Sequence, residues 1–464
     1  MRALSGIFRT RSIAEVEKSA KARKMKRTLT ALDLVLLGIG CIVGTGIFVL
    51  TGVAAARYAG PGIIFSFVIA GFACVLTALV YAELASMIPV TGSTYTYAYV
   101  ALGEIVAWLV GWSMLMEYLI AASMVSVGWS AYLTGLFLAG GIALPHAFTT
   151  PLTEGGIINM PAVLIAIFIG WLLFRGVKES SRFNNFMVLV KIGAILIFLA
   201  LAVPKVSPDH WHPLLPFGIT GMLTGAAIVF TAFIGFDAVC TAAEEARNPR
   251  KDLPIGIVGS ILICTLLYVA VAAVLTGVVP YDQLNNPEPV TYALRVIGYN
   301  MGSALVGIGA ISGITTVLIV LYYGLTRIIF AMSRDCLFPS GLCQIHQSYG
   351  TPYIVTIIAG TIIAVIAGIA PVNVLAELVN IGTLFAFITT SAGAIALRVR
   401  MPNASRPFRC PGLFITAPIS IILCLILMAM LPITAWVRFV AWIVVGLGVY
   451  FVYGHKKAMT AAEK

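Results

Sequence analysis

Long stretches without a charged residue dominate the 464-residue chain. Those of roughly 20 residues or more, the length of a helix that crosses a hydrocarbon core of about 30 Å, are Leu34–Ala56, Pro61–Ala82, Gly155–Phe174, Pro254–Tyr281, Val296–Thr326 and Leu378–Leu397. Further apolar stretches are interrupted by a single charge, which is Glu117, Lys191, Asp237 or Arg438. Because the runs are continuous and do not alternate with polar residues, they predict spanning helices and not the strands of a closed barrel.

The apolar segments together predict about twelve transmembrane helices. They lie near residues 31–56, 61–87, 104–138, 157–176, 185–203, 217–243, 255–279, 301–332, 352–370, 374–397, 412–430 and 434–454. The longest loops between them cover residues 139–156, 204–216, 280–300 and 333–351. No sizeable soluble domain fits into loops of this length, so we expect an all-α integral membrane protein.

Composition and charge agree with this prediction. Hydrophobic residues make up 60% of the chain and charged residues 10%, whereas a soluble domain carries about 25% charged residues. The net charge is +11, and 24 of the 29 Lys and Arg residues fall on one side when the predicted helices cross in turn. This positive-inside pattern predicts a multi-pass protein of the plasma membrane with both termini in the cytoplasm. The basic charge is then a topology signal, and we expect no nucleic-acid partner.

The N-terminal segment and the cysteines add little chemistry. The first 27 residues hold nine Lys and Arg residues and predict either an amphipathic helix on the inner leaflet or a surface tail. The first apolar run exceeds a signal-peptide core of about 7–15 residues, so no cleavable signal is expected. The eight cysteines lie in apolar runs or predicted cytoplasmic loops without a Cys-x-x-Cys pair. We therefore expect no disulfide, no metal site and no cofactor.

A cluster of glycines weakens the first predicted helix. Each glycine costs about 1 kcal/mol relative to Ala in a helix interior. If the helix opens here, the amides of Gly44, Thr45 and Gly46 face a carboxylate. The carbonyls at Ile42 and Val43, which end the first half, then face an ammonium. An α-amino acid carries both charges on one carbon. A packing face of small residues is the alternative explanation of the glycines.

A second glycine beside a charge recurs five helices later, at Gly235 and Asp237. Interrupted helices at matching positions are typical of transporters built from two inverted repeats. The expected organisation is a basic N-terminal segment (1–28), a first five-helix repeat (29–203), a second repeat (217–397), two further helices (412–454) and a tail (455–464).

Several motifs, in chain order, resemble those of one known superfamily. They are Thr28–Asp33 with Gly44–Phe48, Tyr81–Leu84, Pro89–Ser93, Gly111-Trp112, Arg175–Ser180, Ile234–Asp237, Glu244-Glu245 with Asn248-Pro249, and Ala331–Asp335. The chain resembles the amino acid–polyamine–organocation superfamily, and within it the bacterial homologues of the cationic amino acid transporter family. The resemblance implies a LeuT-like fold, with a five-plus-five inverted repeat and broken first and sixth helices, and transport of amino acids.

The resemblance also implies roles in the sixth helix, which is expected to unwind over 230–235. The carbonyls expected to help hold the substrate ammonium are those near Phe230, Thr231, Ala232 and Ile234. Asp237 either shapes the site or meets a cationic side chain, and a cap on the second half-helix is the alternative. The family often has an aromatic residue at 231, where it closes the extracellular gate. Thr231 puts that gate in doubt, and we expect Phe230 or Phe233 to take the place of the missing aromatic residue.

Two charged residues within predicted helices are candidates for coupling. Glu117 lies at the middle of the third helix, where desolvation favours a protonated carboxyl. It is a proton carrier, a partner for a cationic substrate, or a neutral packing group. Lys191 lies on the fifth helix, and its stem either extends to the interface or stays buried. In some superfamily members a lysine here replaces a sodium ion and ties the first helix to the eighth, so Lys191 favours proton coupling over sodium coupling.

The sequence does not decide which kind of substrate side chain the site accepts. Residues of the eighth helix expected to face it are Thr315, Thr316, Val320 and Leu321. Leu321 favours small or apolar side chains, whereas Asp237 and Glu117 favour cationic ones. The five histidines, all in loops, form no catalytic cluster, so we expect no enzyme. The leading hypothesis is a proton-coupled symporter of small neutral or cationic L-amino acids. An amino acid or polyamine exchanger and a non-transporting amino acid sensor are the alternatives.

Overall fold

The computed structural model describes residues 9–10, 29–88, 93–175, 181–241, 246–347, 349 and 351–454. The α-helices are α3 (Ala31–Ile42), α4 (Thr51–Ala54), α5 (Ile63–Met87), α6 (Ser93–Ala101), α7 (Glu104–Ala139), α8 (Met160–Phe174), α9 (Ser181–Ala202), α10 (Gly218–Val229), α11 (Ala238–Thr241), α12 (Pro249–Val278), α13 (Pro289–Val296), α14 (Asn300–Arg334), α15 (Tyr353–Ile369), α16 (Val372–Arg400), α17 (Leu413–Ala429) and α18 (Ile433–Val449). Among the described residues, the β-structure is one isolated bridge between Leu29 and Ala246.

These helices cover the apolar segments of the sequence closely. The described chain contains seven helices that are long and apolar enough to cross a membrane, and five shorter apolar helices. The prediction of an all-helical, multi-span membrane protein is therefore confirmed. Two short helices were not predicted: α6 precedes α7, and α13 lies in the long loop before α14.

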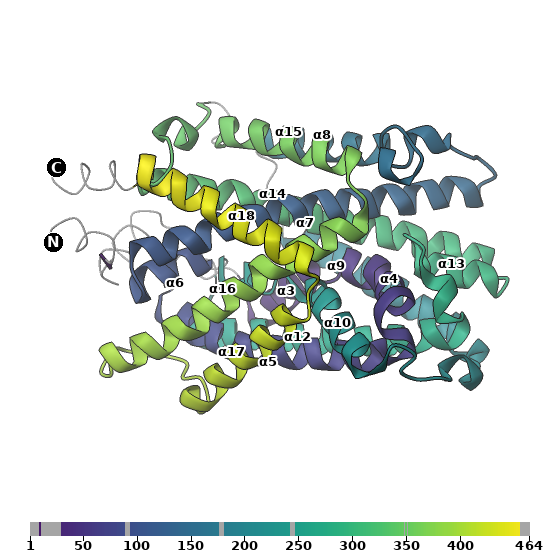
Figure 1. The fold of residues 1–464 in the computed structure, drawn as a ribbon, viewed down its shortest axis with the longest axis horizontal. Helices are drawn as coiled ribbons and strands as arrows, with labels where there is room; N and C mark the ends of the chain where they lie inside the picture. The colour runs from purple at the N-terminus through teal and green to yellow at the C-terminus, as the bar shows by residue number, and fades with distance from the viewer. Residues whose placement is uncertain are drawn as a thin grey trace.

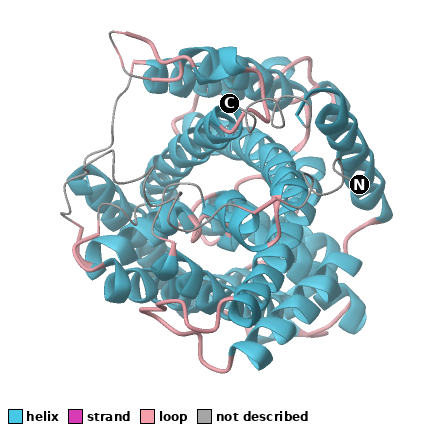
Figure 2. Cartoon of the chain, turned by 90° about the vertical axis from the view of Figure 1, so that its left-hand side faces the viewer, coloured by secondary structure: helices cyan, strands magenta, loops and turns pink. Residues whose placement is uncertain are grey.

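The long helices run side by side along the molecule (Figure 1), and Figure 2 shows the same bundle from one end. Helix α14 packs against α7 and α9, α12 against α3 and α5, and α16 against α7 and α17. Large apolar side chains also cover the outside, for example Leu164 on α8 and Val444 on α18, which are 59% and 61% exposed. An apolar outer surface is what a lipid solvent requires, because lipid tails offer no hydrogen bonds to polar groups.

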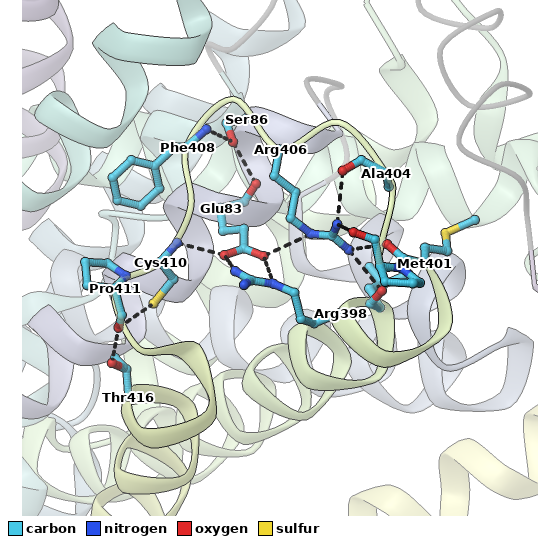
Figure 3. Close-up of polar contacts among 12 residues, drawn as sticks. Glu83, Ser86, Arg398, Met401, Ala404, Arg406, Phe408, Cys410, Pro411 and Thr416 are labelled. Atoms are coloured by element: carbon cyan, nitrogen blue, oxygen red, sulfur yellow. Dashed lines mark hydrogen bonds and ion pairs between the residues drawn. The ribbon is translucent and has the colours of Figure 1, made fainter.

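A buried carboxylate joins α5, α16 and the loop before α17 (Figure 3). Glu83 forms ion pairs with Arg398 and with Arg406, whose Nε lies 3.3 Å from its Oε1. The Cys410 amide donates to Glu83 Oε2 at 2.7 Å. The Arg406 guanidinium also donates to the carbonyl of Leu397 at 3.0 Å, near the C-terminal end of α16. The network ties two helices to a loop, so we regard it as structural.

Some features of the sequence lie outside the described residues. They are residues 1–8 and 11–28 of the N-terminal segment, the tail 455–464, Glu244-Glu245, most of the Pro89–Ser93 motif and most of the Arg175–Ser180 motif.

Candidate functional site

The first helix leaves helical geometry where its glycines are clustered. Helix α3 ends at Ile42, and Val43 takes an extended conformation with φ −75° and ψ 102°. The chain resumes as a π-helical turn, Gly46–Leu50, which continues into α4. The amides that begin this second half have no intrahelical acceptor, and a helix N-terminus attracts anions. The opening therefore has the polarity that a carboxylate needs.

The sixth helix is interrupted at the same depth. After α10 the chain forms a 3₁₀ turn, Phe230–Phe233, and Ile234 is then extended with φ −61° and ψ 139°. Gly235 follows with φ +112°, a conformation that glycine adopts without steric cost. The break is thus shorter than the expected unwinding over 230–235, because its first four residues keep a tight helical turn.

The two interruptions lie directly against each other. A Cβ added to Gly46 would lie 2.3 Å from the Ala232 Cα, and one added to Gly235 would lie 3.0 Å from the Cys41 Cβ. No larger side chain fits at Gly46 without moving the backbone of the sixth helix. The absence of a side chain at Gly46 and at Gly235 therefore lets the two openings pack together.

A small cavity lies at this crossing. The described residues that line it come from the two breaks, α7 and α14: Cys41, Ile42, Gly44, Thr45, Gly46, Ala121, Met124, Val125, Thr231, Ile234, Val317 and Leu321. None of these lining residues carries a charge, and their polar side chains are threonine hydroxyls and a cysteine thiol. The walls from α7 and α14 are entirely apolar. The cavity offers polar backbone at one side and apolar side chains at the other.

Lys191 of α9 lies behind this cavity and is fully buried. Its ammonium donates to the carbonyls of Gly40 at 2.7 Å and Val43 at 3.1 Å, at the end of α3. It also donates to the Thr316 hydroxyl at 2.9 Å and the Gly313 carbonyl at 3.4 Å, both on α14. A single ammonium thus connects the first helix to the eighth helix through four acceptors.

Comparisons with known proteins agree with this geometry. The model of the family described as amino acid permease matches residues 29–452. The chain belongs to the amino acid permease family. A methylthioribose transporter of Bacillus subtilis (strain 168) is 45% identical over 98% of the chain and 99% of its own length. The branched-chain amino acid permease BcaP of the same organism is 47% identical, over 97% and 98%. Cationic amino acid transporter 9, chloroplastic, of Arabidopsis thaliana is 37% identical, over 82% and 68%.

Family membership confirms the resemblance drawn from the sequence motifs. It identifies the chain as a membrane transporter of the amino acid permease family and not as an enzyme. An amino acid is the substrate that this family implies.

The carboxylates of Glu117 and Asp237, which were expected near the substrate, are buried but lie outside the cavity lining. Asp237 Oδ2 accepts a hydrogen bond from the Tyr118 hydroxyl at 3.1 Å. Glu117, the residue before that tyrosine, lies against α16, where a Cβ added to Gly382 would lie 3.6 Å from the Glu117 Cβ. Glu117 and Asp237 are 4% and 6% exposed. The Asp237 carboxylate therefore has a partner within the bundle.

Several carbonyls expected to face an ammonium already accept hydrogen bonds within the permease. The Tyr268 hydroxyl of α12 lies 2.9 Å from the carbonyls of both Ile42 and Ala232, and so joins the two breaks. The Thr231 carbonyl accepts from the Ile234 amide at 3.2 Å. Each of these carbonyls keeps a second lone pair, so each can accept one further hydrogen bond.

Other expected residues point elsewhere. Phe230 packs against Phe387 with ring centroids 5.7 Å apart, and Phe233 packs against Tyr268 at 5.2 Å. Neither phenylalanine is among the described cavity-lining residues. On α14, Leu321 lines the cavity as expected, whereas Thr316 binds Lys191 and Thr315 accepts from the Trp129 indole at 3.0 Å.

Other residues around the cavity are not recognisable from the sequence alone. Three of them make hydrogen bonds: Tyr118 to Asp237, Tyr268 to the Ile42 carbonyl, and Asn380 to Thr231. Five more line the cavity, and they are Cys41, Ala121, Met124, Val125 and Val317. Their positions depend on how each helix is rotated about its axis. A helix that is apolar on every side gives no periodic signal of that rotation.

Proposed function

We propose that this permease is a proton-coupled symporter of L-amino acids with apolar side chains, and that it works by alternating access. The carboxylate would bind the amides at Gly44, Thr45 and Gly46. The ammonium would bind the carbonyl of Ile42 in the first break and those near Phe230, Thr231, Ala232 and Ile234 in the sixth, whereas the Val43 carbonyl accepts from Lys191 instead. The side chain would contact Leu321 and its apolar neighbours. The observation that carries the proposal is the uncharged cavity lining at the crossing of the two breaks.

The lining favours neutral over cationic substrates. A guanidinium or ammonium side chain enclosed by Met124, Val125 and Val317 would lose water without gaining a partner, at a cost of several kcal/mol. Asp237, the carboxylate expected to attract such a side chain, is held by Tyr118. The printed name of one relative, a branched-chain amino acid permease, agrees with an apolar side chain.

For coupling, we propose that Lys191 and Glu117 are the proton-responsive groups. Protonated Lys191 binds carbonyls on α3 and a hydroxyl on α14. A neutral amine has one donor fewer and no charge, so these contacts weaken when the proton leaves. Loss of the proton would thereby release the first helix from the eighth. Glu117 would exchange its proton beside α16 as the bundle moves.

The topology that fits this mechanism has twelve spans, a five-plus-five inverted repeat (29–203 and 217–397), two further helices (412–454), and a plasma-membrane location. The segments 1–28 and 455–464 would then both lie in the cytoplasm. Two observations support it: both interrupted helices occupy matching places in the two halves, and the basic residues fall on one side.

Uptake into proteoliposomes tests the proposal. Radiolabelled leucine should accumulate under an inward proton gradient, without added sodium, and valine and isoleucine should compete for uptake. Arginine should compete weakly. Methylthioribose belongs in the same assay because one relative carries that name, although it lacks the zwitterion that the two breaks would bind. Leucine equilibration without accumulation would favour exchange, and preferred uptake of arginine or methylthioribose would overturn the substrate assignment.

A further inference from the structure

Three polar side chains lie along one face of α16. They are Asn373, Glu377 and Asn380, and their spacing of four and three residues places them one above the other. We call them the α16 polar stripe. Each of the three contacts the first or the sixth helix, the two helices that are interrupted at the cavity.

The outer part of the stripe contacts the end of the first helix. The Asn373 side-chain amide lies 3.0 and 3.1 Å from the two terminal nitrogens of Arg57, and it accepts hydrogen bonds from both when its oxygen is turned toward them. The Tyr58 hydroxyl donates to Glu377 Oε1 at 3.4 Å. Arg57 also donates to Asn285, in the loop that the charge pattern assigns to the extracellular side. These contacts therefore belong to the extracellular half of the permease.

The inner part of the stripe contacts the sixth helix at its break. The Thr231 hydroxyl donates to Asn380 Oδ1 at 2.5 Å, and Asn380 Nδ2 donates to the Ile228 carbonyl at 3.1 Å. Ile228 lies near the end of α10, where helix carbonyls lack intrahelical donors. Thr231 also lines the cavity, so one residue belongs to both the cavity and the stripe.

Exposure falls from Arg57, which contacts the outer end of the stripe, to Asn380 at its inner end. Arg57 is exposed, Asn373 and Glu377 are half-buried, and Asn380 is fully buried. Seven residues of helix cover about 10 Å. The stripe therefore extends from the extracellular surface to the wall of the cavity, which is the path that a substrate would take.

We propose that the α16 polar stripe is the extracellular gate of this permease, and that the Asn380–Thr231 hydrogen bond is its innermost closure. The proposal rests on the proposed function and on its orientation in the membrane. Asn380 is a positioning residue, because it acts through Thr231 and not on the substrate.

Polar contacts suit a gate that opens to water. When the stripe separates from the first and sixth helices, water replaces each lost hydrogen bond, so the net change is small. Opening an aromatic cover would instead expose apolar area to water, at a cost that grows with that area. Thr231 is then the gate residue itself, and no aromatic substitute at Phe230 or Phe233 is needed.

Transport kinetics of Asn380→Ala test the proposal. Loss of the bond should raise the fraction of protein that is open to the outside by about fivefold. Because apparent affinity scales with the binding-competent fraction, the KM for external leucine should fall by up to the same factor. Mere structural damage would lower the maximal rate without lowering KM. Thr389→Val is the matched control, since its hydroxyl donates to Phe385 of the same helix.

A second measurement does not depend on transport. Cys41 lines the cavity, and its modification by a membrane-impermeant methanethiosulfonate reagent, added outside right-side-out vesicles, can be followed by peptide mass spectrometry. Asn380→Ala and Thr231→Val should each speed modification by about fivefold, and the double variant no further. Thr231→Ser should retain the slow rate.

The outcomes separate the gate from the proposed substrate. Faster Cys41 modification in a permease that accumulates no amino acid would support the gate and contradict the symport. Unchanged modification in stably folded Asn380→Ala and Thr231→Val would overturn the gate even if leucine is transported. An equal increase in Thr389→Val would also overturn it, because the effect would then be a general loosening of α16.

Discussion

The ammonium of Lys191 lies 2.9 Å from the Thr316 hydroxyl and 2.7 Å from the Gly40 carbonyl. These acceptors belong to α14 and α3, the eighth and first predicted helices. The contact joins them behind the cavity, within the hydrophobic interior. A charge at this depth requires compensation, and here it comes from carbonyl and hydroxyl oxygens. The state of this one amine is therefore connected to the geometry of the first break.

Replacing Lys191 by Met should abolish proton-driven accumulation while leaving exchange. Methionine keeps much of the length of the side chain but has no proton and no donor, so α3 is no longer held by a titratable group. In proteoliposomes, leucine should equilibrate across the membrane but not concentrate under an inward proton gradient. Ser312→Ala is a suitable control, because the Ser312 hydroxyl on α14 is exposed and donates within its own helix. Gradient-driven accumulation that survives in Lys191→Met would remove Lys191 from the coupling mechanism.

The features that the sequence predicted share a local signal. Glycines clustered around Gly44, and Gly235 beside a charge, weaken a helix wherever they occur, so the sequence alone predicts both breaks. It also singles out Lys191, because a cation is rare in an apolar run. It does not single out Asn380, since one amide in a spanning helix has no local signature. Its partner Thr231 is distant in sequence, and only the rotation and packing of α16 bring them together.

Shortening Leu321 should change the preference among apolar substrates. Leu321 lines the cavity from α14, and a lost methylene contact in such a pocket changes discrimination by about 10-fold or more. Leu321→Ala should therefore raise the KM for leucine about tenfold and change that for alanine much less. Leu325→Ala, one turn further along and fully buried, should lower the yield of folded protein without changing the ratio of the two KM values. Equal KM changes for leucine and alanine in Leu321→Ala would contradict the assignment.

Removing the charge of Asp237 should leave substrate selectivity unchanged. Its carboxylate accepts from the Tyr118 hydroxyl and does not belong to the described cavity lining. Asp237→Asn should therefore keep the ratio of leucine to arginine uptake, whatever happens to the rate. Val125→Glu is the contrasting variant, because it places a carboxylate in the lining and should reduce leucine uptake sharply. Loss of arginine binding in Asp237→Asn, measured by competition, would instead show that Asp237 meets a cationic side chain.

Neutralising Glu83 should destabilise the permease without altering its substrate site. Glu83 is 2% exposed and forms ion pairs with Arg398 and Arg406 (Figure 3). Removing one partner of a buried ion pair costs about 3–5 kcal/mol, because the remaining charges are left without compensation. Glu83→Gln should thus melt at a clearly lower temperature in detergent, whereas Glu154→Gln, in an exposed loop, should melt like the unmodified permease. The KM for leucine should stay the same in the Glu83→Gln protein that remains folded, since the network lies apart from the residues that line the cavity. A KM that shifts while the melting temperature does not would mean that the network takes part in the transport cycle.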